Sequence, residues 1–412
     1  MNIALGPIGT FVQLYLLMLY GHEAGTVYAV LAVAAFNAVS IPAALIWGVA
    51  ADRLHKRKII IVSSYLLTAV LLLSFLVTSS ATGVIVVYSL VSFISSATAT
   101  PLDLLIMETE PKNKWATGFA KLSLVSSIGV MLGFVLSSFW AQYMPEQWLV
   151  IPLGVLSLVS AVMSLVLVPE PLFVFEREVI GMHKPLSQRL AAFPLVFLKF
   201  PNLYDFRSTF KGLRNELTSY VPMLYISLIF FYLGSGIFNA AFVPSLSSHL
   251  LSGSDVYAIS VVAMIAQILA FRYAGKYITE EKSLAMIATQ SVTLRGACYA
   301  LLGITFVVFP GALFLLPSAV LYAIAAGACF GIYYTASNTM VFNSIGGRNH
   351  GSSLGVYSAV VGIATTIGSL LSGLTSVYLG FDITFLVAGG MLGVSALITL
   401  RLARNHGQET NN

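Results

Sequence analysis

The stretch "WGVAADRLHKRK" (residues 47–58) places one acidic and four basic residues between two long apolar runs. Charged residues make up only 9% of the 412-residue chain, while hydrophobic types make up 58%. Soluble domains carry about 25% charged residues, so this composition is not compatible with a surface that is largely exposed to water. The apolar runs on either side are long enough to cross about 30 Å of hydrocarbon as helices of roughly 20 residues. The composition therefore predicts a membrane protein.

Apolar runs of this length recur along the whole chain. Only helices and closed barrels satisfy their backbone groups in lipid, and continuous rather than alternating hydrophobicity favours helices. The fold class is thus an all-α polytopic membrane protein with twelve transmembrane helices. The predicted spans are 3–20, 26–48, 59–78, 83–104, 115–141, 147–168, 220–243, 255–275, 283–309, 313–340, 350–378 and 382–401.

The basic residues alternate between the loops. Those of 53–58 lie between spans two and three, and most of the others lie after, or at the inner ends of, spans four, six, eight, ten and twelve. The intervening loops, such as "GHEAG" (21–25) and "FPG" (309–311), contain no Lys or Arg. Positive residues mark the cytoplasmic side, so both termini are predicted to be cytoplasmic in a multi-pass protein of the cytoplasmic (plasma) membrane. The positions of the basic residues are thus explained by the orientation of the chain in the membrane, and a nucleic-acid partner is not expected.

The longest polar interval, 169–219, divides the spans into two sets of six. A faint repeat supports this division, since "GFVLSSF" (133–139) in span five is echoed by "GSLLSGL" (368–374) in span eleven. The expected domains are an N-terminal six-helix bundle, a cytoplasmic central loop, a C-terminal six-helix bundle and a cytoplasmic tail, at 1–168, 169–219, 220–404 and 405–412. The first apolar run has no cleavage site and should be retained, and its short length suggests a start codon further upstream.

Gly48, Asp52 and Arg53 keep a fixed spacing, and three bases follow at 56–58. This arrangement resembles the loop motif of the major facilitator superfamily, Gly-x-x-x-Asp-Arg-x-Gly with two or three bases between spans two and three. His55 stands where the family usually has its second glycine, and the equivalent loop of the second half, "AGKYITEEKS" (274–283), lacks the Asp-Arg pair. The resemblance covers essentially the whole chain, and it implies two six-helix bundles and transport by alternating access.

The acid in this loop calls for an explanation beyond topology, because it adds nothing to the positive-inside bias. In the family the loop belongs to a charge network that includes an acid at the inner end of span four, the place of Asp103 here. An acid–base pair at the membrane edge is partly desolvated and can hold two helix arrangements. The predicted conformational latch comprises Gly48, Asp52, Arg53, Arg57 and Asp103, with Arg53 better suited to a lipid headgroup. For the other bases, a purely topological role stays open.

Polar residues near the middle of the spans are candidates for binding a solute. Transporters built from paired repeats bind near the bilayer midplane between the halves, and the resemblance implies that spans one, four, seven and ten line this site. The candidates are Gln13, Asn37, Ser92, Ser96, Tyr232, Asn239, Gln267, Arg295, Tyr334 and Asn338. Hydrogen bonding between helices explains the amides equally well, and packing explains the serines better.

Arg295 is the only basic residue placed near a membrane midplane. Insertion of an arginine there costs about 2.5–3.5 kcal/mol, and no acid lies at its estimated depth. Its partner can be backbone carbonyls, water or an anionic substrate. A structural or gating role is preferred, because span nine is a supporting helix in the family.

The sequence lacks the residues that several other functions require. No Asp or Glu lies at mid-depth, and Phe134 follows Gly133 where many drug–proton antiporters have Gly-Pro, so proton antiport is not supported. No motif of a metalloprotease, an esterase or a phosphate loop occurs, so no enzyme, metal or cofactor is expected. Cys298 and Cys329 are interpreted as small hydrophobes. Tyrosines, amides and hydroxyls would suit a neutral sugar-like or amphipathic solute.

The predicted function is secondary active or facilitative transport of a small solute by alternating access. The alternative is a multi-pass sensor or scaffold that retains the fold without transporting anything. The largely intact loop motif favours transport, because a scaffold has no need of a latch. The expected partners are a small-molecule substrate and membrane lipid, and a monomer is expected.

Overall fold

The computed structural model describes residues 1–54, 57–98, 102, 115–168, 220–277, 284–344 and 350–409. All regular structure in this part of the chain is helical. Eleven of its helices are long and apolar enough to cross a membrane, and the first, Asn2–Ala44, has 43 residues. At 1.5 Å per residue that helix would be about twice as long as the hydrocarbon core is thick, so it must supply two spans.

This double span turns at Gly21, within α2 (Ile8–Leu54). Gly21 has φ 72°, a backbone conformation that residues with a side chain rarely adopt. Gly25 then lies against the backbone of Leu17, so the chain folds back on itself as two adjacent spans. Positive φ recurs at Gly311 and Gly380, which belong to two other turns predicted to lie outside the membrane. The twelve-span fold is therefore confirmed, with its first turn made by glycine.

The N-terminal half contributes six spans. Span one consists of α1 and the first part of α2, span two is the second part of α2, and the remaining four follow in order. The helices are α1 (Asn2–Leu5), α2, α3 (Arg57–Ser74) with η1 (Phe75–Val77), α4 (Ala81–Ser95) with η2 (Ser96–Thr98), α6 (Trp115–Tyr143), and η4 (Glu146–Leu149) with α7 (Val150–Leu167).

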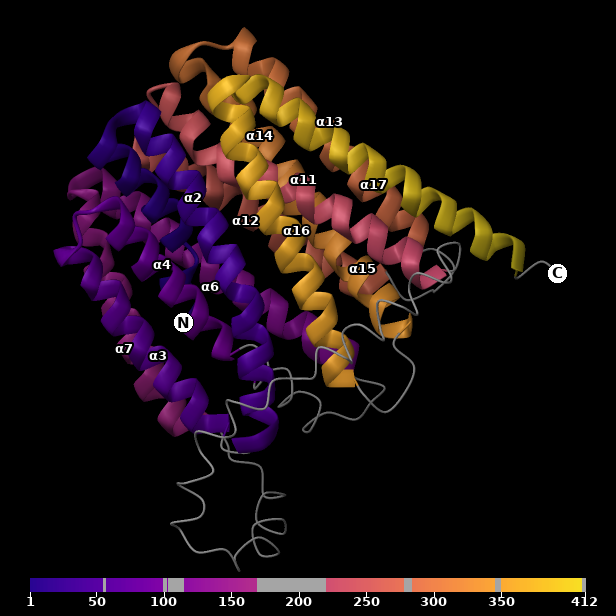
Figure 1. Ribbon diagram of the computed structural model, residues 1–412, viewed down its shortest axis with the longest axis horizontal. Helices are drawn as coiled ribbons and strands as arrows, with labels where there is room; N and C mark the ends of the chain where they lie inside the picture. Colours follow the sequence, from indigo (N-terminus) through magenta and orange to yellow (C-terminus); the bar gives the residue numbers. More distant parts are fainter. Residues whose placement is uncertain are drawn as a thin grey trace, which may run out of the picture.

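The C-terminal half contributes the other six spans, and Figure 1 shows the two groups of helices side by side. Span ten is irregular, because a π-helical segment interrupts it. The helices are α11 (Tyr220–Ser248), α12 (Gly253–Tyr277), α13 (Leu284–Val308), η6 (Gly311–Phe314) with α14 (Leu315–Tyr322), η7 (Ala323–Cys329) and α15 (Phe330–Ser344), α16 (His350–Tyr378) and α17 (Phe381–Glu409). The predicted central loop, 169–219, lies outside the described residues.

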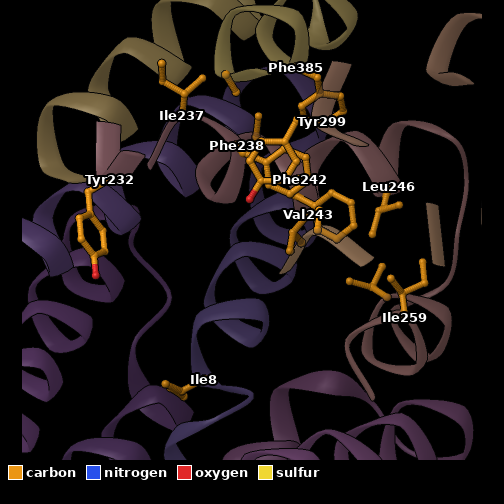
Figure 2. Close-up of a cluster of buried hydrophobic side chains, with 14 of the residues drawn as sticks. Ile8, Tyr232, Ile237, Phe238, Phe242, Val243, Leu246, Ile259, Tyr299 and Phe385 are labelled. Carbon is orange, nitrogen blue, oxygen red and sulfur yellow. The ribbon is translucent and has the colours of Figure 1, made fainter. Parts of the chain in front are cut away.

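Stacked aromatic rings form much of the core of the C-terminal half. Phe238 of α11 stacks on Tyr299 of α13 with ring centroids 3.7 Å apart, and Phe385 of α17 closes the group (Figure 2). Such pairs contribute about 0.5–1.5 kcal/mol each beyond the area they bury. Gly368 of α16 lies so close to the Leu233 carbonyl of α11 that a β-carbon would overlap it. Small residues of this kind let membrane helices approach closely, and they hold α11 at the centre of its half.

Candidate functional site

The first described contact between the two halves joins α2 to α16. The Asn37 side-chain amide donates to Ser369 Oγ over 3.2 Å. Towards the predicted outer end, Gly373 packs against Val30. Asn37 thus has a hydrogen-bond partner in the opposite half. This agrees with the alternative that amides within the spans bond to neighbouring helices instead of to a solute.

The second contact joins α6 to α12 nearer the predicted outer end. Ser138 and Ser254 form a reciprocal pair, in which each hydroxyl donates to the backbone carbonyl of the other over 3.0 Å. Their Oγ atoms are 3.2 Å apart. A neutral hydrogen bond contributes only about 0.5–1.5 kcal/mol net. We call these two contacts, Asn37–Ser369 and Ser138–Ser254, the seam; both are neutral and weak enough to open.

A polar network connects three helices of the C-terminal half. The Tyr357 hydroxyl of α16 donates to Asn338 Oδ1 of α15 over 3.0 Å. The Tyr357 oxygen lies 3.2 Å from the Tyr232 hydroxyl of α11, which is then the donor of the second bond. Figure 2 shows the Tyr232 ring pointing away from the stacked rings around Phe238. The network therefore lies beside the aromatic core rather than inside the stack around Phe238, since the Tyr232 ring centroid is 5.1 Å from that of Phe231.

Asn239 shares the helical face of Tyr232, because seven residues make two turns of α11. Its side chain is exposed. This is unusual for α11, since 72% of its most apolar window is buried, more than in any other candidate span of the described residues. An exposed amide is poorly suited to lipid, so this face is the best candidate for contact with a polar solute.

Three candidates of the N-terminal half are buried or largely buried. Gln13 is 5% exposed; its amide donates to the Gly9 carbonyl over 3.2 Å, while its Oε1 has no partner among the described residues. Ser92 donates to the Phe36 carbonyl of span two, and Ser96 donates to the carbonyl of Ser92, each over 2.8 Å. The two serines thus have backbone partners, whereas Gln13 keeps a free acceptor.

Two candidates of the C-terminal half lie near span ten. Gln267 of α12 is 8% exposed, and its backbone lies against Gly327 and Gly331. Tyr334 has its ring centroid 6.1 Å from that of Phe271 and 5.6 Å from that of Phe330. Both residues lie beside the π-helical segment.

Arg295 of α13 is 3% exposed and sits among aromatic rings. Its Nε and Nη2 donate to the Tyr299 hydroxyl over 2.9 and 2.7 Å. Its guanidinium carbon lies 4.9 Å from the centroid of Phe231 and 5.1 Å from that of Phe330, a cation–π arrangement. Its Nη1 has no partner among the described residues. Arg295 therefore reaches from span nine towards spans seven and ten.

The family model of the Major Facilitator Superfamily matches residues 3–316 and 224–412. The chain belongs to the major facilitator superfamily. It is also similar in structure to the xylose transporter XylE from E. coli in a partially occluded inward open conformation, with a TM-score of 0.65 and 13% sequence identity over 97% of this chain and 96% of that one. At that identity the likeness shows the fold alone. Among curated proteins, none matches this chain in sequence.

Membership of this superfamily makes the chain a multi-pass membrane transporter of small solutes. It points to transport rather than to catalysis. The predicted latch stays a prediction. The surroundings of Gly48 and the side chains of Asp52, Arg53 and Arg57 are not described, and Asp103 lies outside the described residues altogether. Nearby, Trp47 Nε1 donates to the Phe93 carbonyl over 2.8 Å and connects span two to span four.

Sequence reasoning did not find Tyr357, which links the other two members of the network. The transporter has 19 tyrosines, and nothing in the sequence around Tyr357 distinguishes it from those in the core. Ser369, Ser138 and Ser254 were missed for the same reason, since serine is frequent in all of these spans. Their partners depend on how each helix is rotated, which the sequence pattern does not show.

Proposed function

We propose that this transporter works by alternating access, with the two halves rocking about a central site. The seam supports this proposal, because both of its contacts are neutral hydrogen bonds and the Ser138–Ser254 pair lies near the predicted outer end. Such contacts stabilise a closed outer end and still separate at small cost. Transport is either secondary active or facilitative.

The solute site in this proposal is the face of α11 that carries the buried Tyr232 and the exposed Asn239, together with its neighbours. The site has hydroxyl groups from Tyr232 and Tyr357 and an amide from Asn338. Asn239 adds a second amide two turns beyond Tyr232 in α11. Gln13 of the N-terminal half adds an acceptor that has no partner among the described residues. A few converging polar groups in an otherwise apolar surrounding are typical of small-molecule sites.

The proposed location is the cytoplasmic (plasma) membrane, with both termini in the cytoplasm and lipid as the surrounding partner. The alternation of basic loops supports this orientation. We propose a monomer, because each half already contributes a six-helix bundle to one complete fold. Thiol labelling from each side of the membrane tests the orientation.

The latch remains part of the proposal, and it leads to a first prediction. Asp52→Asn should sharply reduce solute flux in liposomes while leaving expression and thermal stability close to normal, because the acid is needed when the halves move. The motivation is the spacing of Gly48, Asp52 and Arg53. Lys58→Gln serves as the control, since it removes a charge from the same loop without changing Asp52, Arg53 or Arg57. Full flux in the Asp52→Asn variant would remove the latch from the account.

A further inference from the structure

The Arg295 guanidinium carries a positive charge that no described residue neutralises. Two of its nitrogens donate to the neutral Tyr299 hydroxyl, and Nη1 has no partner. Carboxylates do occur in the described helices, but Glu146, Asp255 and Asp382 lie in first turns at the predicted outer end. A desolvated charge without a counter-charge is costly, and cation–π contacts with the surrounding rings offset only part of this cost.

A second unpartnered group faces the same space. Ser235 of α11 is 4% exposed, and its hydroxyl has no partner among the described residues. It lies between Phe231, which stacks under Arg295, and Phe238, which stacks on Tyr299. Residues spaced four and three apart share one helical face, so Ser235 is turned towards α13. Two donors without an acceptor thus lie between the same two helices.

The charge also acts on the proposed solute site. The Arg295 guanidinium carbon lies 4.9 Å from the centroid of Phe231, whose ring centroid is 5.1 Å from that of Tyr232, and the Tyr232 hydroxyl belongs to the network with Tyr357 and Asn338. In a medium with an effective dielectric constant of about 20, a unit charge about 10 Å away changes the affinity for an opposite unit charge by roughly 10- to 20-fold. Low-dielectric walls of one charge sign concentrate ligands of the other sign.

We infer that the transported solute is an anion, selected by the positive field of Arg295 behind the face of α11 that carries Tyr232. The inference builds on the proposed function and adds the substrate class to it. Arg295 acts here as a specificity-determining residue through its field, while Tyr232, Asn239 and Asn338 are the groups proposed to touch the solute. A neutral sugar-like solute, which the side-chain composition alone would suit, is the competing outcome.

The first test compares probes that differ mainly in charge. Thermal unfolding of the purified full chain is measured with glucuronate, glucose and glucosamine, and with benzoate, benzamide and benzamidine. A ligand that binds only the folded state raises the melting temperature. In a set whose members bind, the inference predicts that the acid raises the melting temperature at a concentration at least about tenfold lower than the neutral compound requires. Stabilisation by glucose, benzamide or the cations alone, or by none of the acids, counts against it.

The second test changes the charge. Arg295→Gln should lower the affinity for the acids about tenfold and leave that for the neutral probes within about twofold. Arg295→Lys, which keeps the charge and loses the double hydrogen bond to Tyr299, should keep most of the preference for acids. A purely structural arginine would instead change both classes of probe equally in both variants. The wild-type comparison remains decisive if a variant fails to fold.

Flux distinguishes this inference from the proposed function. Each stabilising probe is loaded into liposomes with and without the protein. Transport of neutral or cationic probes with no transport of acids would overturn the anion inference and leave the transporter proposal intact. Binding of acids without flux of any probe would instead contradict the transporter proposal.

Discussion

Oxidation of a Ser138→Cys/Ser254→Cys pair is expected to reduce solute flux to the level of protein-free liposomes, and reduction should restore it. The two Oγ atoms are 3.2 Å apart across the seam. Cysteines placed there should come close to the β-carbon separation of a disulfide, about 3.5–4.5 Å. A covalent bond between α6 and α12 would hold the outer end closed, and a transporter that cannot open on one side completes no cycle. Flux is measured in a background that carries Cys298→Ala and Cys329→Ala.

The matched control is a cross-link within one half. Ser227 and Ser395 also have their Oγ atoms 3.0 Å apart, but both belong to the C-terminal half. A disulfide at Ser227→Cys/Ser395→Cys, verified by loss of free thiols, should leave flux largely intact if each half moves as a unit. Unchanged flux in the fully cross-linked Ser138→Cys/Ser254→Cys pair would show that the seam does not open during transport.

The second large effect is expected for Tyr357→Phe. This change keeps the ring but removes the hydroxyl that accepts from Tyr232 and donates to Asn338. Leaving a buried polar group without its partner costs about 1–3 kcal/mol, which corresponds to roughly 5- to 150-fold in affinity. We expect the solute's KM to rise within this range, while the melting temperature without solute falls by only a few degrees.

Tyr257→Phe provides the control for this change. Tyr257 is also fully buried, but its hydroxyl has no hydrogen-bond partner among the described residues. Removing an unsatisfied hydroxyl should be neutral or slightly stabilising, and solute affinity should not change. Equal losses of affinity in both variants would mean that the network has no special relation to the solute.

The fold could be predicted from the sequence because lipid leaves few choices. Continuous apolar runs must be helices, and the loops without bases alternate with loops that carry them, so the twelve spans followed from composition and charge. The turn between spans one and two was expected from "GHEAG". The structure makes this turn at the single residue Gly21, and helix continues directly on both sides of it. The irregular backbone of span ten could not be expected, since "AIAAGAC" has no proline, and its one glycine is common in transmembrane helices.

The site was predictable only in part. Spans such as α11 are apolar on nearly all faces, so no hydrophobic stripe shows which side turns towards the centre. Tyr232, Asn239 and Asn338 could be proposed as candidates because amides and tyrosines near the middle of a span are unusual, whereas nothing singled out Tyr357 and Ser369. Arg295 was recognised as unusual from its depth. Tyr299 lies four residues further along the same helix, but Phe231 and Phe330 come from two other helices, and their contacts with Arg295 depend on tertiary packing.

The most direct test of alternating access is labelling of Asn239→Cys, in the background without native cysteines, by a membrane-impermeant maleimide. Right-side-out and inside-out vesicles are compared, because Asn239, the exposed residue of this α11 face, should open to each side in turn. Ser252→Cys, exposed at the predicted outer end, should react only from outside, and Arg404→Cys, exposed near the C-terminus, only from inside. The account predicts that Asn239→Cys reacts from both sides and more slowly when a stabilising solute is bound. Reaction from one side only, with or without solute, would contradict alternating access at this site.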